Sequence, residues 1–350
     1  MIRFSTFLVV PCLVLVRSSG LAQTIDTARV RAAYDSVTAR RAEYERLHGR
    51  FVTVNGIRMH YLEWGKPNGI PLVWAHGSAS SAYEIRAVAT RLVQAGYRLL
   101  AVDYRGHGLT RVTDYDFGIH HIADDLIGLL DSLRIPAAIF GGASKGGSVA
   151  AAVYDHYPTR VLGLLMADGG TWSLQWMFDR MSPDELRRSM SDPVPQITGA
   201  SEFDVFLRVV GNIPPGDLPI EWLFDMLFRI GPSENGEWAF LPGFDRMMGS
   251  NEAAGITRPS TFPPLQWSEN AMIPRMVFRR LHVPMMILDP QGERDARPVT
   301  DQNERLAKDH PDLVSHRIYP QSRHNILQSR PDWFVRDAVE LLDQVRRRRR

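Results

Sequence analysis

The sequence predicts an α/β fold, in which a mostly parallel β-sheet is covered by helices on both faces. Short apolar runs alternate with helical stretches over residues 50–170, and the alternation returns from residue 282. Such alternation is typical of βαβ units, whose parallel strands are buried on both sides. Residues 171–281 show no strand of comparable strength. We therefore expect a helical lid inserted over the carboxyl edge of the sheet, where open α/β sheets place their sites.

The first half of the chain contains most of the expected strands. A hairpin is predicted on the Asn55-Gly56 turn, because this dipeptide adopts the positive φ angles of a tight hairpin. The helix over 119–134 is predicted from apolar residues that recur on one face, such as Ile122 and Leu126. The strands are expected at 51–54, 57–62, 71–75, 98–103, from 138 to the glycines that follow, and 161–168, with further helices at 82–96 and 148–154.

The second half adds two strands, at 283–288 and 314–319, and helices near 299–309 and from 331 onward. The polar stretch before the core has apolar residues at loose helical spacing, which predicts a surface helix. The expected organisation is a signal peptide at 1–22, a helical extension at 23–49, an α/β core at 50–170 and 282–345, a lid at 171–281 and an Arg-rich tail at 346–350.

The first residues have the pattern of a secretory signal. A basic start is followed by an apolar run from Phe4 to Val16 and by small residues before a cleavage site after Ala22. The single cysteine, Cys12, lies in this leader, so the mature protein needs no disulfide. We expect a periplasmic or secreted protein without a membrane anchor after cleavage; the alternative is an uncleaved N-terminal anchor helix.

The charge balance excludes a strong attraction to nucleic acid. The formal net charge is +2, and the basic excess lies in the leader and in Arg346 to Arg350. The Arg run is expected to continue the last helix as a solvated tail, where cations interact well with the helix dipole.

The nucleophile is predicted at Ser144. Residues Gly142-Ala143-Ser144-Lys145-Gly146 form a G-x-S-x-G motif between an apolar run and a helix of small residues. In that context the turn holds the serine in a strained conformation, with its hydroxyl at the top of the sheet. The glycines are needed because helix and strand approach closely.

A serine hydroxyl needs a base to accept its proton and an acid to orient that base. The base is predicted at His324, in the polar loop between the last strand and the last helix. The acid is predicted at Asp295, in the loop after the preceding strand, with Asp289 as the main alternative and Asp168 as a further option. Asp103 is expected to order its own loop together with Arg105.

Two N–H donors are needed for the negative charge of a tetrahedral intermediate. One is expected from the backbone of Lys145. The other is expected from Ser78, after the strand that ends at Ala75, where Gly77 permits a close backbone approach.

The landmarks His76-Gly77, Arg105-Gly106-His107-Gly108, the Ser144 motif, an acid and His324 resemble those of the α/β-hydrolase superfamily, in the same order. The resemblance covers about 50–170 and 282–345, and it implies a cofactor-free hydrolase with an acyl-serine intermediate. Epoxide hydrolases of this fold use aspartate at the elbow, so Ser144 favours acyl substrates. The chain departs from the common pattern at Lys145, where an uncharged residue is usual. We expect its side chain to reach water; the alternative is contact with a carboxylate of the substrate.

Together these features predict an exported serine hydrolase that cleaves an ester or lactone of a small or medium apolar substrate. Five of the eight tryptophans lie in 171–281, either as a pocket wall or as the lid's own core. The alternatives are a proline iminopeptidase-like aminopeptidase, with Glu202, Glu221 or Asp225 as the amine site, a carbon–carbon bond hydrolase, and a non-catalytic ligand-binding protein. No cofactor, metal or nucleic-acid partner is predicted, and the sequence leaves the oligomeric state open.

Overall fold

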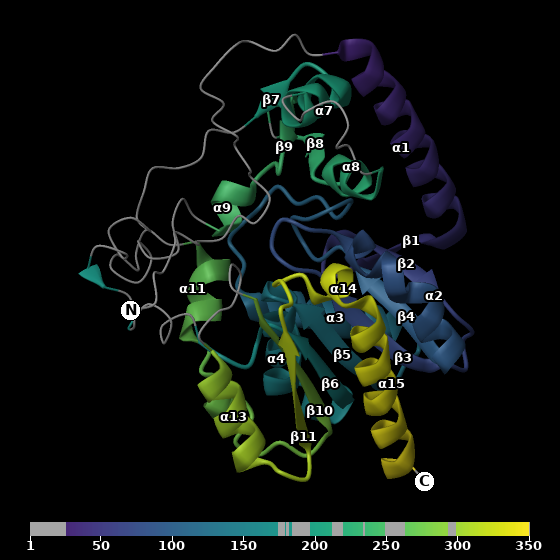
Figure 1. The fold of residues 1–350 in the computed structure, drawn as a ribbon. Helices are drawn as coiled ribbons and strands as arrows, with labels where there is room; N and C mark the ends of the chain where they lie inside the picture. Colours follow the sequence, from purple (N-terminus) through teal and green to yellow (C-terminus); the bar gives the residue numbers. More distant parts are fainter. Residues whose placement is uncertain are drawn as a thin grey trace.

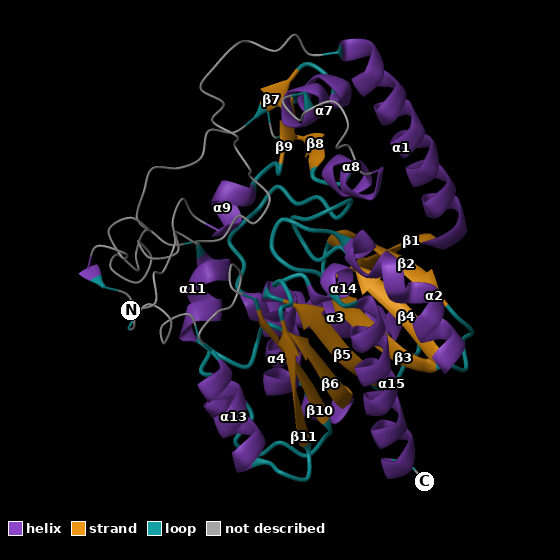
Figure 2. Cartoon of the chain, in the orientation of Figure 1, coloured by secondary structure: helices purple, strands orange, loops and turns teal. Residues whose placement is uncertain are grey.

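The computed structural model describes residues 26–173, 197–211, 220–233, 235–248, 263–292 and 299–349, together with residues 179, 182 and 183. Figure 1 shows a twisted central sheet with helices packed against both faces, and Figure 2 separates its strands from the surrounding helices. The predicted signal peptide lies outside the described residues.

The central sheet has eight strands in the order β1-β2-β4-β3-β5-β6-β10-β11. β1 and β2 pair antiparallel, β2 and β4 pair antiparallel, and all the later pairs are parallel. This confirms the predicted α/β class with a mostly parallel sheet. The strands are β1 Gly49–Val54, β2 Ile57–Trp64, β3 Ile70–Ala75, β4 Tyr97–Val102, β5 Ala138–Ala143, β6 Val161–Ala167, β10 Met285–Gln291 and β11 Val314–Pro320.

The helices that cover the sheet bury one apolar face each. Leu126 of α3 and Val149 of α4 belong to one hydrophobic core, and Leu92 of α2 and Phe334 of α15 belong to the other. Two separate cores are expected when a parallel sheet is covered on both faces. The helices of the core are η1 Ala82–Ile85, α2 Arg86–Ala95, α3 Ile119–Ser132, α4 Lys145–His156, η2 Pro158–Arg160, α13 Thr300–Asp309, α14 Ile326–Ser329 and α15 Pro331–Arg348.

The predicted helix before the core is α1, Thr27–His48. It lies beside the inserted segment at one side of the molecule (Figure 1). Arg41 of α1 forms an ion pair with Glu202 of the inserted segment at 2.7 Å, and Tyr34 donates a hydrogen bond to the same carboxylate at 2.8 Å. No helix within the described residues is both long enough and apolar enough to cross a membrane.

The segment between β6 and β10 contains short helices, as predicted, and a small antiparallel sheet that was not predicted. This sheet has the order β7-β9-β8. Its strands are too short to leave an alternating pattern in the sequence. The elements described here are β7 Thr198–Gly199, α7 Glu202–Val210, α8 Ile220–Leu227, β8 Ile230–Pro232, β9 Trp238–Phe240, α9 Phe244–Met248, α11 Pro264–Ala271 and α12 Pro274–Val277.

Candidate active site

Ser144 occupies the sharp turn between β5 and α4. Its backbone has φ 52° and ψ −120°, a conformation that costs a non-glycine residue about 1–3 kcal/mol. The flanking glycines leave no room for side chains: a Cβ on Gly142 would lie 2.2 Å from the carbonyl carbon of Gly146, and a Cβ on Gly146 would lie 2.0 Å from the Ala75 oxygen. The strained elbow is therefore enforced by close packing of helix on sheet.

Asp168 leaves the neighbouring strand beside Ser144. Ala143 of β5 is the register partner of Ala167 of β6, so the next residue of each strand emerges at the same edge. The Ser144 N–H donates to the Ala167 carbonyl at 2.9 Å. A Cβ built on Gly169 would lie 2.7 Å from the Ser144 Cα. The parallel register of β5 and β6 thus brings Ser144 and Asp168 to the same edge of the sheet.

His324 lies in the loop between β11 and α14, and its Nδ1 forms a short hydrogen bond with an Asp168 carboxylate oxygen. The His324 side chain is 17% exposed, whereas that of Asp168 is 1% exposed. A carboxylate on Nδ1 fixes the tautomer that keeps Nε2 available as a base. The described residues show no hydrogen bond between Ser144 and His324; such bonds often tighten only when substrate is bound.

Of the two acids predicted after β10, Asp289 is described and makes its hydrogen bonds away from His324. Asp289 lies at the end of β10 and is fully buried, but its Oδ2 lies 2.9 Å from His316 Nε2 and 3.1 Å from Asn303 Nδ2. Asp295 lies outside the described residues. The carboxylate at His324 comes from the end of β6 instead. The sequence signal for it was the Asp168 that directly follows a buried strand.

The predicted oxyanion loop lies against the nucleophile. A Cβ on Gly77 would lie 3.5 Å from the Ser144 Cβ. Ser78 follows in a turn closed by the Ser80 N–H and the Gly77 carbonyl, at 3.2 Å. Lys145 is the first residue of α4, and first-turn N–H groups have no acceptor within a helix. The loop and the helix start therefore flank Ser144; the donor roles of Ser78 and Lys145 stay predictions.

Glu84 is a site residue that the sequence analysis missed. Its carboxylate accepts the Gly77 N–H at 3.1 Å and the Trp74 indole N–H at 3.2 Å. Burial raises the pKa of Glu84 to about 7, although the two donors act in the opposite direction. Glu84 thus holds Gly77, the residue before the predicted oxyanion donor Ser78, through a backbone hydrogen bond. A glutamate in a helical turn carries no sequence signal for such a role.

The Lys145 side chain was expected to reach water, but it is buried. It is 3% exposed and pairs with the Glu269 carboxylate of α11, while its Nζ donates to Gln266 Oε1 at 2.9 Å. A buried cation in the first turn of a helix is disfavoured both by desolvation and by the helix dipole. The carboxylate on α11 compensates for both. Lys145 therefore links the nucleophile elbow to the inserted segment.

The expected pairing of Asp103 with Arg105 is also corrected. Asp103 accepts from the Ala82 N–H at 2.6 Å and from the Leu109 N–H at 2.8 Å, and it contacts His60 Nδ1 at 2.7 Å. Arg105 instead makes a bidentate ion pair with Asp125 of α3, at 2.6 and 2.7 Å. Asp103 still orders its loop, as predicted, but through backbone N–H groups.

Comparison with known families identifies the family of the chain. The model of the alpha/beta hydrolase family matches residues 72–338, which is more than half of the chain.

Two curated relatives are both named as epoxide hydrolases. Epoxide hydrolase A of Mycobacterium tuberculosis is 36% identical over 104 residues, which are 29% of this chain and 32% of that protein. An epoxide hydrolase of Caballeronia sordidicola is 34% identical over 191 residues, which are 54% of this chain and 47% of that protein. The chain thus spans about a third to a half of these relatives.

Among solved structures, that of E-2-(acetamidomethylene)succinate hydrolase superposes with a TM-score of 0.60 and 18% identity. It covers 84% of this chain and 98% of its own. At this level of identity the likeness concerns the fold.

Proposed function

Because the chain belongs to the alpha/beta hydrolase family, we propose that it is an exported serine hydrolase that cleaves an ester or lactone bond of a small or medium apolar substrate. The observation that carries the proposal is Ser144 in a strained elbow between β5 and α4, beside the His324–Asp168 pair. A serine held in this way attacks acyl carbons when a neutral imidazole accepts its proton.

The proposed mechanism uses residues of the core. His324 Nε2 takes the Ser144 proton as Oγ adds to the carbonyl carbon, and Asp168 stabilises the resulting imidazolium. The N–H groups of Lys145 and Ser78 hold the oxyanion. The tetrahedral intermediate expels the alcohol, which receives the proton from His324. A water molecule, deprotonated by the same imidazole, then adds to the acyl carbon, and the acid leaves as His324 returns the proton to Ser144 Oγ.

The names of the curated relatives do not transfer directly to this chain. An epoxide opens to an alkyl ester on an elbow aspartate, as the sequence resemblance implies, but the elbow residue here is Ser144. We therefore expect turnover of p-nitrophenyl esters and none of styrene oxide. Turnover of the epoxide by wild type but not by Ser144→Ala would redirect the proposal to epoxide chemistry.

The aminopeptidase alternative loses its expected amine site. Glu202 is paired with Arg41, while Glu221 and Asp225 are both paired with Arg86. A carboxylate already neutralised by an arginine is a weak partner for a substrate ammonium group. No observation within the described residues favours this alternative over the esterase.

The lid role of the inserted segment is part of the proposal. It is supported by contacts at the carboxyl edge of the sheet: the Ile119 N–H donates to Ser268 Oγ at 2.7 Å, and Lys145 pairs with Glu269. Phe228 of the insertion stacks on Tyr83 with ring centroids 3.6 Å apart. These contacts favour an insertion fixed to the core, with part of its aromatic content used for docking.

The proposal is tested with Ser144→Ala and with Ser148→Ala as a matched control one turn later on α4. Both variants and the wild type are assayed on p-nitrophenyl butyrate, an acyl lactone, proline p-nitroanilide and a fluorophosphonate label. We expect Ser144→Ala to lose ester turnover and labelling by about 10⁴-fold or more, and the control to keep both. Undiminished turnover in Ser144→Ala overturns the proposal, and ligand binding without turnover supports the binding-protein alternative.

Export is tested by expressing the full chain in a bacterium and measuring the mass of the purified protein. The proposal expects cleavage after Ala22 and recovery from the periplasm or the medium. A full-length protein retained with the membrane would support the uncleaved anchor.

A further inference from the structure

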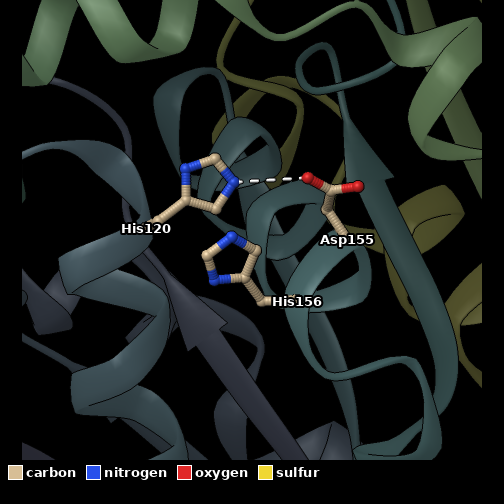
Figure 3. Close-up of side chains that lie close together, drawn as sticks. All are labelled: His120, Asp155 and His156. Carbon is tan, nitrogen blue, oxygen red and sulfur yellow. Dashed lines mark hydrogen bonds and ion pairs between the residues drawn. The ribbon is translucent and has the colours of Figure 1, made fainter.

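A second group of reactive side chains lies at the far end of α4 from the nucleophile. His120 lies near the start of α3, and Asp155 and His156 lie at the end of α4 (Figure 3). One ligand-type atom from each of the three residues lies within 4.8 Å of the others. Within the described part of the chain, no other group of three or more such side chains meets this spacing.

The three side chains converge. His120 Nε2 lies 3.4 Å from an Asp155 carboxylate oxygen. The imidazole rings of His120 and His156 stack with centroids 4.0 Å apart and planes inclined by 26°. Two stacked imidazoles and a carboxylate at one point give two nitrogen donors and one oxygen donor. The proposed catalytic steps use none of the three.

The scaffold behind these side chains is rigid. α3 and α4 share one hydrophobic core, which includes Ile122 and Val153. Tyr157, directly after α4, donates to the Asp124 carboxylate at 2.7 Å and ties the end of α4 to the second turn of α3. The backbones are therefore fixed, while Asp155 and His156 are exposed and His120 is half-buried. The exposed side-chain ends have room to adjust.

The electrostatic setting favours a cation at this point. A neutral imidazole offers the lone pair that a metal ion requires. The carboxylates of Asp155 and Asp124 contribute negative charge beside the two rings.

We propose that His120, Asp155 and His156 form a binding site for a Zn²⁺-class divalent ion that joins α3 to α4, with water completing the coordination. Two imidazole nitrogens and one carboxylate suit zinc and its neighbours, whereas Mg²⁺ and Ca²⁺ prefer oxygen ligands. Tetrahedral zinc needs ligand atoms roughly 3.3 Å apart, so the exposed side chains must move inward by small torsional changes.

The position of the site assigns it a structural role. His156 is eleven residues after Lys145 on α4, a separation of about 16 Å along the helix. A bound ion would therefore contact no substrate at Ser144. It would hold the C-terminal end of the helix whose first turn follows the nucleophile, and so stabilise the folded chain by binding only that state.

The test uses the full chain, freed of metal by dialysis against a chelator and carrying no histidine tag. Zn²⁺ alone is titrated in competition with a chromophoric chelator, and the Tm is followed with and without Zn²⁺. We expect one equivalent bound with micromolar or tighter affinity and a higher Tm. Loss of a residue that hydrogen-bonds to a metal ligand lowers metal affinity by about 10–100-fold. Because His120 and His156 are ligands themselves, His120→Ala and His156→Ala should each lower the Zn²⁺ affinity by about 100-fold or more.

The matched control is His310→Ala, a change at a half-buried histidine after α13, which should bind Zn²⁺ as the wild type does. The Tm of each zinc-free variant shows whether it is folded. With Co²⁺ as probe, the wild type and His310→Ala should show visible absorption that His120→Ala lacks. Equal Zn²⁺ affinity in the wild type and the two ligand variants, or no binding by the wild type, overturns the proposal.

Discussion

His324 and His60 each contact an aspartate at the end of a strand, but their surroundings differ in two ways. His324 has one carboxylate partner, on Nδ1, and a side chain that is 17% exposed. His60 is fully buried, and both of its nitrogens contact carboxylates, Asp103 at 2.7 Å and Glu45 at 3.1 Å. Within the described part of the chain, His324 therefore keeps a nitrogen for a reacting group, whereas both nitrogens of His60 are occupied.

The charge states follow from these contacts. Burial alone would lower the pKa of His60, but Asp103 and Glu45 outweigh it and raise the pKa to about 9. His60 is therefore an imidazolium at neutral pH, and a general base must be neutral. The comparison teaches that a histidine–carboxylate contact does not by itself mark a catalytic pair. A catalytic pair is marked by a histidine that also has a free nitrogen beside a nucleophile.

The largest expected effect concerns the catalytic side of this comparison. Asp168→Asn should lower kcat for an ester by about 10⁴-fold, because the asparagine favours the wrong tautomer of His324. Steady-state kinetics on p-nitrophenyl butyrate measures the loss. Asp289→Asn, at the neighbouring strand end, is the matched control and should change kcat little. A larger loss in Asp295→Asn than in Asp168→Asn would restore the acid predicted from the sequence.

Substitution of His60 should lower the free energy of unfolding and leave kcat unchanged. His60→Gln removes the imidazolium between two carboxylates, and breaking a buried ionic contact in this way costs about 3–5 kcal/mol. Urea denaturation measures the change. The kcat per active site, counted by fluorophosphonate titration, should match that of the wild type. If kcat falls with little change in stability, His60 is part of the catalytic machinery and the comparison fails.

The two regions also differ in how far the sequence predicted them. The strands around Ser144 were predicted within a few residues, because continuous apolar runs bounded by glycine and proline identify buried strands. The predictions of Ser144 as nucleophile and His324 as base rest on the same pattern. The same pattern left the acid open between several aspartates near strand ends, and only the register of β5 beside β6 brings Asp168 next to Ser144.

Contacts between segments that are distant in the sequence were out of reach. Glu45, His60 and Asp103 come from three separate elements, and Lys145 meets Glu269 across 124 residues. No local periodicity encodes such pairs. The expectation that Lys145 would reach water followed a general rule that lysines are exposed, which fails when a partner charge is supplied by an insertion.

The pH dependence of stability sharpens the comparison further. Because the folded-state pKa of His60 is about 9 and its ordinary value is 6.5, its contribution is fully present below about pH 6.5 and is lost as the pH rises to about 9. A shift of this size corresponds to roughly 3 kcal/mol. Chemical denaturation between pH 6 and 9.5 should show the free energy of unfolding fall in the wild type. His60→Gln should flatten this fall; an equal slope in both proteins contradicts the assignment.

The smallest expected effect concerns the buried ion pair between Lys145 and Glu269. Lys145→Met and Glu269→Met each leave one charged group without its partner between the elbow and α11, so we expect kcat/KM to fall by about 10-fold, a loss of about 1.4 kcal/mol. The double variant Lys145→Met/Glu269→Met removes both charges and should recover part of the loss, because an apolar pair costs no desolvation. The kcat/KM of the wild type, the two single variants and the double variant is measured on p-nitrophenyl butyrate and on a bulkier aryl ester. Additive losses would show that Lys145 and Glu269 act independently. In that case the elbow would not depend on a charge from a distant element, whereas His60 depends on Asp103 and Glu45.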